Sequence, residues 1–177
     1  MSARGGARRR RRPGEFDPSD IFAALNAARI KYLVVGGIAV VLYGVNRTTS
    51  DVDLAVELTA ENLKALETVL QRLGFMRRVP IPIQGLADPK VRRLWTRQKG
   101  MKVYSFMERQ PPARTIDVMV KPLANFQEAY ARRATTTIHD VPVPLIPLDL
   151  LSQMKREAGR PEDLLDLKAL RDLGRIP

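Results

Sequence analysis

Three aspartates lie inside short apolar runs, and their placement constrains the fold more strongly than any other feature of the sequence. Asp51 and Asp53 alternate with apolar residues over 51–56, and Asp117 interrupts a similar run at 115–120. This alternation predicts two strands, and on the first strand both carboxylates leave the same face about 6–7 Å apart. A carboxylate in an apolar strand is costly unless a partner compensates its charge. The three aspartates are therefore predicted to face a shared site.

The other patterns predict a single layer of strands with helices around it. An apolar strand at 31–35 is broken by Gly36-Gly37, and a short buried helix follows at 38–43. The segment 80–102 is predicted as a loop followed by a basic stretch. The remaining predicted elements are helices at 17–29, 59–73 and 125–133, extended segments at 101–107 and 141–146, and two closing C-terminal helices at 148–158 and 161–173. This order predicts an α+β (α/β) fold class with a small mixed β-sheet and flanking helices.

The residue composition excludes several classes of site. The chain has 177 residues, no cysteine and one histidine, His139. Without cysteine there is no disulfide scaffold, thiolate metal site or cysteine nucleophile. With a single histidine, a zinc site or a histidine-based triad is disfavoured, and His139 is interpreted as a surface turn residue.

The positive charge of the chain is unevenly distributed. Lys and Arg number 30 against 19 acidic residues, which gives a net charge of +11. Six of these positive charges fall in an Arg-rich leader, residues 1–16, that we expect to be disordered, and 17–177 is expected to form one domain. Residues 72–109 carry ten basic and two acidic side chains. This region is a candidate for binding RNA, with Trp95 either stacking on a base or buried in the core.

Nothing in the sequence predicts export or a membrane partner. Acidic residues follow the basic leader directly, where a secretory signal would need an apolar stretch. The longest uncharged run, 32–46, has 15 residues and contains a Gly pair, too short to span a bilayer comfortably. We therefore expect a cytoplasmic protein.

The aspartates suggest metal chemistry. Carboxylates without His or Cys suit Mg²⁺ or Mn²⁺. Three of them converging from two strands can hold two ions roughly 4 Å apart, an arrangement used in phosphoryl transfer. Alternatively, the aspartates cap loops or pair with Arg47 and Arg114. Gly36-Gly37 at a strand end lets a phosphate approach the backbone, although a tight packing turn explains the pair equally well.

In combination, these motifs resemble a known superfamily. Gly36-Gly37, Asp51-Val52-Asp53 and Asp117 resemble the three-part signature of the DNA polymerase β-like nucleotidyltransferases. More closely, residues 36–40, 43–44, 47–54 and 155–167 are similar to small AbiEii-type toxin nucleotidyltransferases. The resemblance covers about 32–173. Gly37 departs from the more familiar Gly-Ser signature and lacks the hydroxyl that would contact a phosphate.

The resemblance implies roles for individual residues. Asp51 and Asp53 would ligate the metals that carry a nucleoside triphosphate (NTP), and Asp117 would complete the second metal site and help to deprotonate the attacking hydroxyl. Gly36 and Gly37 would bind the nucleotide.

Arg47 and Lys155 are the candidate cations near the phosphates. For Arg47 the alternative is a salt bridge to Asp51 or Asp53, and for Lys155 it is a solvated helix face. Asp166 or Asp163 would orient Lys155, although acidic residues in the first turn of a helix are also explained by the helix dipole.

The function that we expect is transfer of a nucleoside monophosphate from an NTP to a hydroxyl of RNA, for example a tRNA end, or of a protein, with release of pyrophosphate. Mg²⁺ or Mn²⁺ would be the cofactor. Such an enzyme could belong to a toxin–antitoxin pair, with a partner protein from a neighbouring gene. The alternatives are a non-catalytic, antitoxin-like binding module that retains the fold, and transfer to a small molecule.

Overall fold

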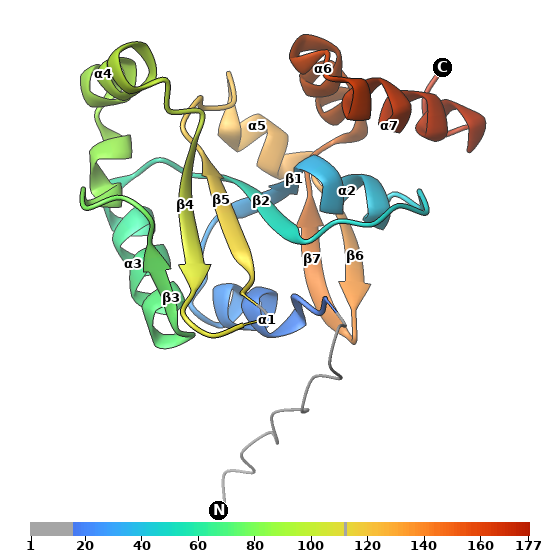
Figure 1. Cartoon of the computed structure of the whole chain (residues 1–177). Helices are drawn as coiled ribbons and strands as arrows, with labels where there is room; N and C mark the ends of the chain where they lie inside the picture. The colour runs from blue at the N-terminus through green and yellow to red at the C-terminus, as the bar shows by residue number, and fades with distance from the viewer. Residues whose placement is uncertain (1–15, 112) are drawn as a thin grey trace, which may run out of the picture.

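The protein forms a seven-stranded mixed sheet with helices around it (Figure 1). The computed structural model describes residues 16–111 and 113–177, so nearly all of the predicted leader lies outside the described residues. The sheet order is β3-β4-β5-β2-β1-β7-β6, with β2 parallel to β5, β1 parallel to β7 and the other neighbours antiparallel. The strands are β1 Tyr32–Val35, β2 Asp51–Val56, β3 Phe75–Arg77, β4 Val103–Glu108, β5 Thr115–Met119, β6 Ala134–Ile138 and β7 Val141–Leu145.

Helix-capping rules account for several of the helix ends. The Thr59 side chain accepts a hydrogen bond from the backbone of Asn62 at the start of α3, and Asp88 does the same for Lys90 in α4. Gly100 and Gly159 end α4 and α6 in the left-handed conformation. The helices are α1 Ser19–Ala27, α2 Gly36–Leu42, α3 Ala60–Arg72, α4 Pro89–Lys99, α5 Phe126–Ala131, α6 Leu148–Ala158 and α7 Pro161–Asp172, with a 3₁₀ helix η1 at Ile83–Ala87.

The sheet is most deeply buried at its centre. Every residue of β1 is buried, as expected for a strand covered on both faces. In β4 and β5 burial alternates, with Tyr104, Phe106, Ile116 and Val118 on the buried side. Arg77 of β3 pairs with Glu67 of α3, so α3 covers that same side. The opposite side of β3, β4 and β5 is partly open.

The predicted fold class is confirmed, including both closing helices. The sequence patterns missed β3 and β6, and the basic stretch after the loop is helix α4. Gly36 and Gly37 form the first turn of α2, so this helix begins two residues earlier than predicted.

Trp95 is buried and does not present its ring for stacking on a base. Its side chain is 7% exposed and packs against Gly85 and Tyr104, so the interpretation as a core residue is the correct one. His139 lies in the turn between β6 and β7, as predicted. In the described part of the chain, no helix has the length and apolar character needed to cross a membrane.

Candidate active site

The three predicted aspartates meet at one cavity. Because β2 and β5 are parallel neighbours, Asp53 lies directly opposite Asp117, and Asp51 lies opposite Thr115. All three aspartates line a cavity of about 320 Å³. Two strands that are distant in the sequence therefore present their carboxylates side by side, as the period-two alternation predicted.

The closeness of these carboxylates has an electrostatic cost. Burial, with a further contribution from Asp117, raises the pKa of Asp53 to about 6, and the same two causes raise the pKa of Asp51. One backbone hydrogen bond from Gly37 acts in the opposite direction on Asp53. Within the described residues, Oδ1 of Asp117 is buried and has no hydrogen-bond partner. The site therefore holds negative charge that calls for a cation.

The alternative pairings proposed for the aspartates are wrong. Arg114 is buried and pairs with Asp20 at 2.5 Å and Glu108 at 2.7 Å. Arg47 pairs with Asp166, not with Asp51 or Asp53. The arginines that could have neutralised the three aspartates are engaged elsewhere.

Gly36 is required by the approach of Asp53. It has φ +63°, a left-handed conformation that favours glycine. A Cβ atom there would overlap the Asp53 carboxylate, its nearest neighbour. At position 37 a Cβ would instead approach Thr49 Oγ1 at 3.0 Å and Arg47 Nη2 at 3.3 Å. The glycine pair thus lets the end of β1 approach both β2 and the loop before it.

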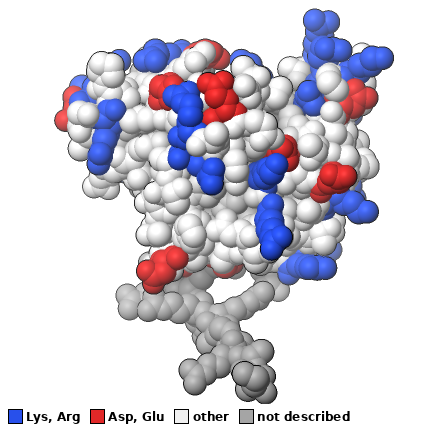
Figure 2. All heavy atoms as spheres, turned by 180° about the vertical axis from the view of Figure 1, so that it is seen from behind, with Lys and Arg blue, Asp and Glu red and all other residues white. Residues whose placement is uncertain are grey.

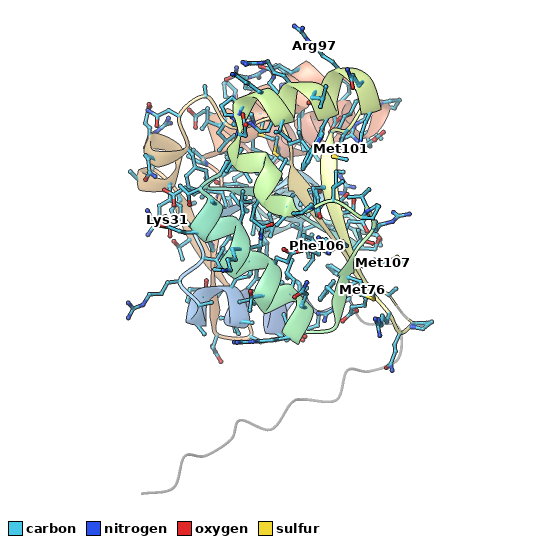
Figure 3. All side chains as sticks on the ribbon, turned by 90° about the vertical axis from the view of Figure 1, so that its left-hand side faces the viewer. Lys31, Met76, Arg97, Met101, Phe106 and Met107 are labelled. Atoms are coloured by element: carbon cyan, nitrogen blue, oxygen red, sulfur yellow. The ribbon has the colours of Figure 1, made fainter. Side chains whose placement is uncertain are left out.

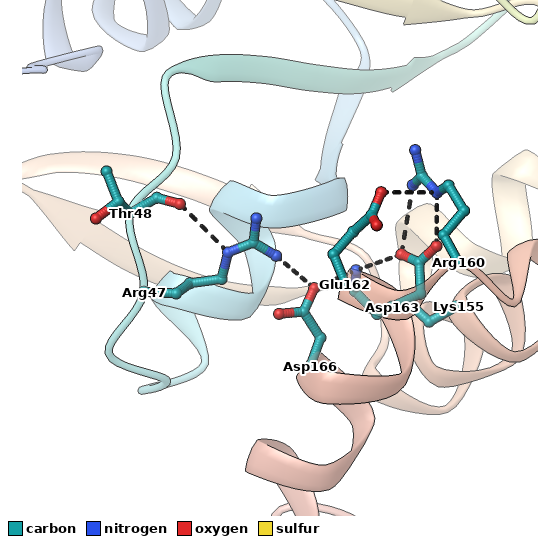
Figure 4. Close-up of polar contacts among 7 residues, drawn as sticks. All are labelled: Arg47, Thr48, Lys155, Arg160, Glu162, Asp163 and Asp166. Carbon is teal, nitrogen blue, oxygen red and sulfur yellow. Dashed lines mark hydrogen bonds and ion pairs between the residues drawn. The ribbon is translucent and has the colours of Figure 1, made fainter.

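A group of cations also lines the cavity, and Figure 4 shows the carboxylates with which these cations pair. Lys155 of α6 is 5% exposed, so its interpretation as part of a solvated helix face is wrong. Its Nζ donates to Asp163 Oδ1 at 3.0 Å and to Asp166 Oδ2 at 2.6 Å. Both of these aspartates are therefore placed to orient Lys155, as the resemblance implied.

Arginines complete this group from two directions. Arg47 Nη1, from the loop before β2, lies 2.5 Å from Asp166 Oδ2. Arg160, at the start of α7, donates through Nε to Asp163 at 2.7 Å. Burial would raise the pKa of the Asp163 carboxyl, but its hydrogen bonds with Arg160 and Lys155 outweigh burial and lower that pKa. Asp163 is 1% exposed and forms ion pairs with Lys155 and Arg160. The helix dipole is therefore not the only interaction that stabilises its charge.

Among the polar residues that line the cavity, sequence reasoning gave no role to Arg160 and Thr49. Arg160 sits between the Gly159 helix end and Pro161, a position that a loop-and-helix pattern leaves without a function. Thr49 lies two residues before Asp51, inside the segment 47–54 that carries the resemblance, but the resemblance assigned it no role. Only the folded chain shows that both reach the same cavity.

The donor atoms fit a hard divalent cation, although they do not form a complete cage. Carboxylate oxygens of Asp51, Asp53 and Asp117 are suitable ligands for Mg²⁺ or Mn²⁺. Asp117 Oδ1 has no hydrogen-bond partner among the described residues, so it is available as a metal ligand. Across residues 16–111 and 113–177, no three acidic or histidine side chains converge closely enough to hold a metal ion by themselves. Mg²⁺ commonly binds one or two carboxylates together with substrate phosphates, and an incomplete set of protein ligands suits that mode of binding.

No protein-family model matches the chain, and no curated protein matches it. Solved structures do. The lincosamide antibiotic adenylyltransferase LnuA, with lincomycin bound, has a TM-score of 0.56 over 85% of this chain and 92% of its own, at 15% identity. ANT(2'')-Ia, in complex with adenylyl-2''-tobramycin, has a TM-score of 0.56 over 87% and 86%, at 16% identity.

A third similar structure is a Thermotoga maritima protein assigned to the nucleotidyltransferases. Its TM-score is 0.52 over 86% of this chain and 88% of its own, at 14% identity. None of these three proteins is described as an AbiEii-type toxin, so that narrower resemblance rests on the sequence motifs. The three structures together establish that this chain has the nucleotidyltransferase fold.

Proposed function

We propose that this protein is a metal-dependent nucleotidyltransferase that moves a nucleoside monophosphate from an NTP to an acceptor hydroxyl. The observation that carries the proposal is the juxtaposition of Asp53 and Asp117 on parallel strands, facing a cavity that Arg47, Lys155 and Arg160 also line. Carboxylates that need a cation, in one cavity with cations that suit phosphates, match the needs of a metal-bound triphosphate.

Two groups of side chains that line the cavity would have different roles. Asp51, Asp53 and Asp117 would hold Mg²⁺ or Mn²⁺, which when bound neutralises phosphate charge and polarises the reacting oxygens. The Asp117 carboxylate would also accept the proton of the attacking hydroxyl. The hydroxyl oxygen forms a bond to the α-phosphorus while the bond from that phosphorus to the bridging oxygen breaks, and pyrophosphate leaves.

The cations that line the cavity would position the triphosphate. Asp163 and Asp166 hold Lys155 and Arg160 in fixed directions, which limits the reorganisation needed when the phosphates bind. Arg47 is anchored to Asp166 in the same way.

The open face of the sheet supports RNA as the acceptor. Strand register aligns two rows of side chains across this face, and each row ends at a catalytic aspartate. The rows are Met76–Met107–Thr115–Asp51 and Ser105–Asp117–Asp53. Phe106 and Met107 point to opposite sides of β4, and Met76 lies beside Met107 (Figure 3). Met76 is 45% exposed and Met107 40% exposed.

Basic side chains flank the outer end of these rows. Arg78 follows β3, and its backbone donates to Ser105; Arg109 follows β4 and its guanidinium contacts the Met76 sulfur. Both arginines are exposed, and neither forms an ion pair with another described residue. Three strand spacings of about 4.8 Å separate this edge from Asp51. A single RNA strand could therefore place phosphates at the arginines and its terminal hydroxyl at the aspartates.

A small-molecule hydroxyl is the second candidate acceptor. Two proteins of the same fold, LnuA and ANT(2'')-Ia, are named for antibiotic substrates or carry an adenylylated antibiotic. A second cavity of about 500 Å³ adjoins the first through Arg47 and Thr49, and its size suits a drug-sized ligand.

Labelled nucleotides separate the two candidates. The protein, Mg²⁺ and each α-³²P-labelled NTP are incubated with cellular RNA in one arm and with lincomycin or tobramycin in another. The proposal predicts label in RNA. Label only in the small molecules would favour the second candidate, and label in neither acceptor, with no pyrophosphate released, would favour the non-catalytic binding module.

A pair of double variants tests the RNA path. Arg78→Glu/Arg109→Glu should lower kcat/KM for the RNA acceptor about tenfold at physiological salt, because it reverses the charges beside the two rows. Lys64→Glu/Arg72→Glu makes the same change in net charge on α3, which covers the opposite face, and should stay within about twofold. Equal losses in both variants would indicate a general charge effect and not this path.

A further inference from the structure

The Thr49 hydroxyl reaches the cavity through the space that Gly37 leaves open. A Cβ atom on Gly37 would lie 3.0 Å from Thr49 Oγ1 and 3.3 Å from Arg47 Nη2. Both side chains line the same cavity as Asp51 and Asp53. Because Gly37 has no side chain, the Thr49 hydroxyl and the Arg47 guanidinium converge on one small open volume beside the carboxylates.

This hydroxyl is not used by the rest of the described chain. Thr59 accepts a hydrogen bond from the backbone of Asn62, and Thr68 and Thr96 donate to helix carbonyls. Thr49, in contrast, forms no side-chain hydrogen bond with any residue in 16–111 or 113–177. A half-buried donor without a partner, facing a cavity, is available to a ligand.

The neighbouring charge identifies the kind of ligand. Arg47 can only donate hydrogen bonds, and it carries a positive charge. A group that binds both Arg47 Nη2 and Thr49 Oγ1 must therefore accept hydrogen bonds, and an anionic oxygen is favoured.

We propose that Thr49 Oγ1 donates a hydrogen bond to a phosphate oxygen of the NTP, with Arg47 Nη2 on the same phosphate. This inference rests on the proposed function and assigns to Thr49 the binding of the triphosphate tail. Gly37 borders this phosphate position, because a Cβ atom there would approach the same hydroxyl and guanidinium.

The test measures binding of inorganic tripolyphosphate with Mg²⁺ by titration calorimetry, and binding of each NTP in parallel. Thr49→Val keeps the side-chain shape, removes the donor and should weaken binding of tripolyphosphate about tenfold, the loss expected for a hydrogen bond to a charged group. Thr49→Ser should stay within about twofold of wild type. Thr48→Val is the matched control, because the Thr48 side chain is exposed and only its backbone carbonyl meets Arg47.

A hydroxyl moved to the neighbouring position provides a second, independent comparison. Position 37 has no left-handed backbone requirement, so Ser fits the backbone there. Thr49→Ala should bind tripolyphosphate weakly, and Gly37→Ser/Thr49→Ala should regain most of the lost affinity, because the new hydroxyl enters the same volume. This comparison also holds if Thr49→Val fails to fold.

The outcomes separate this inference from the proposed function. Wild-type affinity in Thr49→Val, or no recovery in Gly37→Ser/Thr49→Ala, would overturn the assignment of Thr49 while leaving the nucleotidyltransferase proposal in place. A wild-type protein that binds neither tripolyphosphate nor any NTP would overturn both.

Discussion

Gly36 and Asp53 are in contact where β1 passes into α2, and each limits what the other can be. Val35 pairs with Asp53 in the β1–β2 ladder, so the next residue, Gly36, meets the Asp53 carboxylate directly. A tight turn of this kind can be predicted from Gly-Gly after an apolar run. The identity of the atom it accommodates cannot, because that depends on pairing with a strand fifteen residues later.

Replacing Gly36 by Ala should destabilise the protein by about 2–4 kcal/mol, from left-handed backbone strain plus a collision with Asp53. Gly100→Ala is the control, since Gly100 has nearly the same φ, +60°, and nothing within 4 Å of the added Cβ. It should cost only about 1 kcal/mol. Urea unfolding of both variants measures the difference, and equal losses would mean that the contact with Asp53 is unimportant.

Asp53 is predicted to reduce the stability of the metal-free protein. Its pKa is raised from 3.8 to about 6, chiefly by burial, so the folded state favours the protonated carboxyl. The contribution of that protonated carboxyl to the stability of the protein is lost as pH rises through about 6. At pH 8 in EDTA, Asp53→Asn should therefore raise the free energy of unfolding by about 1–3 kcal/mol. Asp172→Asn, the same change at an exposed carboxylate, should stay within about 0.5 kcal/mol. A less stable Asp53→Asn protein would contradict the electrostatic account.

At the scale of elements, the closing pair α6 and α7 carries the cation side of the site. Both helices and the Gly159 stop between them are predictable from local patterns, because an amphipathic run, a C-terminal glycine and Pro161 are all local signals. Local patterns do not predict that Asp166 meets Arg47, a residue before β2. That ion pair forms only when the helix pair docks against the sheet.

The buried ion pairs of this helix pair predict an asymmetry between two lysines. Among the described residues, Lys155→Met leaves Asp163 paired only with Arg160 and Asp166 paired only with Arg47, and should cost about 3 kcal/mol, because removing the buried partner of two buried carboxylates is expensive. Lys168→Met on α7 breaks an exposed pair with Asp172 and should cost at most about 0.5 kcal/mol. Thermal and urea denaturation of the two variants provide the comparison. Similar losses would show that burial of Lys155 does not matter.

At the scale of the whole molecule, the positive charge of the chain is not spread evenly over the surface (Figure 2). Seen from behind, basic side chains gather where α4 lies, while acidic and basic groups are mixed elsewhere (Figure 2). The exposed basic residues of α4 are Lys90, Arg93, Arg97 and Lys99. Counting charges in the sequence predicted a basic region, but only the strand register shows which arginines flank the rows that lead to the aspartates.

Features that depend on local sequence patterns could be predicted, and features that depend on the order of strands in the sheet could not. Period-two alternation placed Asp51, Asp53 and Asp117 on strands, and the fold confirmed that they share one cavity. The short edge strand β3 escaped prediction because three residues carry too little periodicity. Arg160 and Thr49 escaped because their neighbours in space come from other elements.

The most direct test of the account is transfer of the α-phosphate label from an NTP to an acceptor by purified wild type, Asp53→Asn and Asp117→Asn, with Asp172→Asn as the control. The account predicts that wild type and Asp172→Asn transfer label and release pyrophosphate at similar rates, while each site variant is at least about a hundredfold slower and still folded. Label transfer at the wild-type rate by folded Asp53→Asn or Asp117→Asn would contradict it.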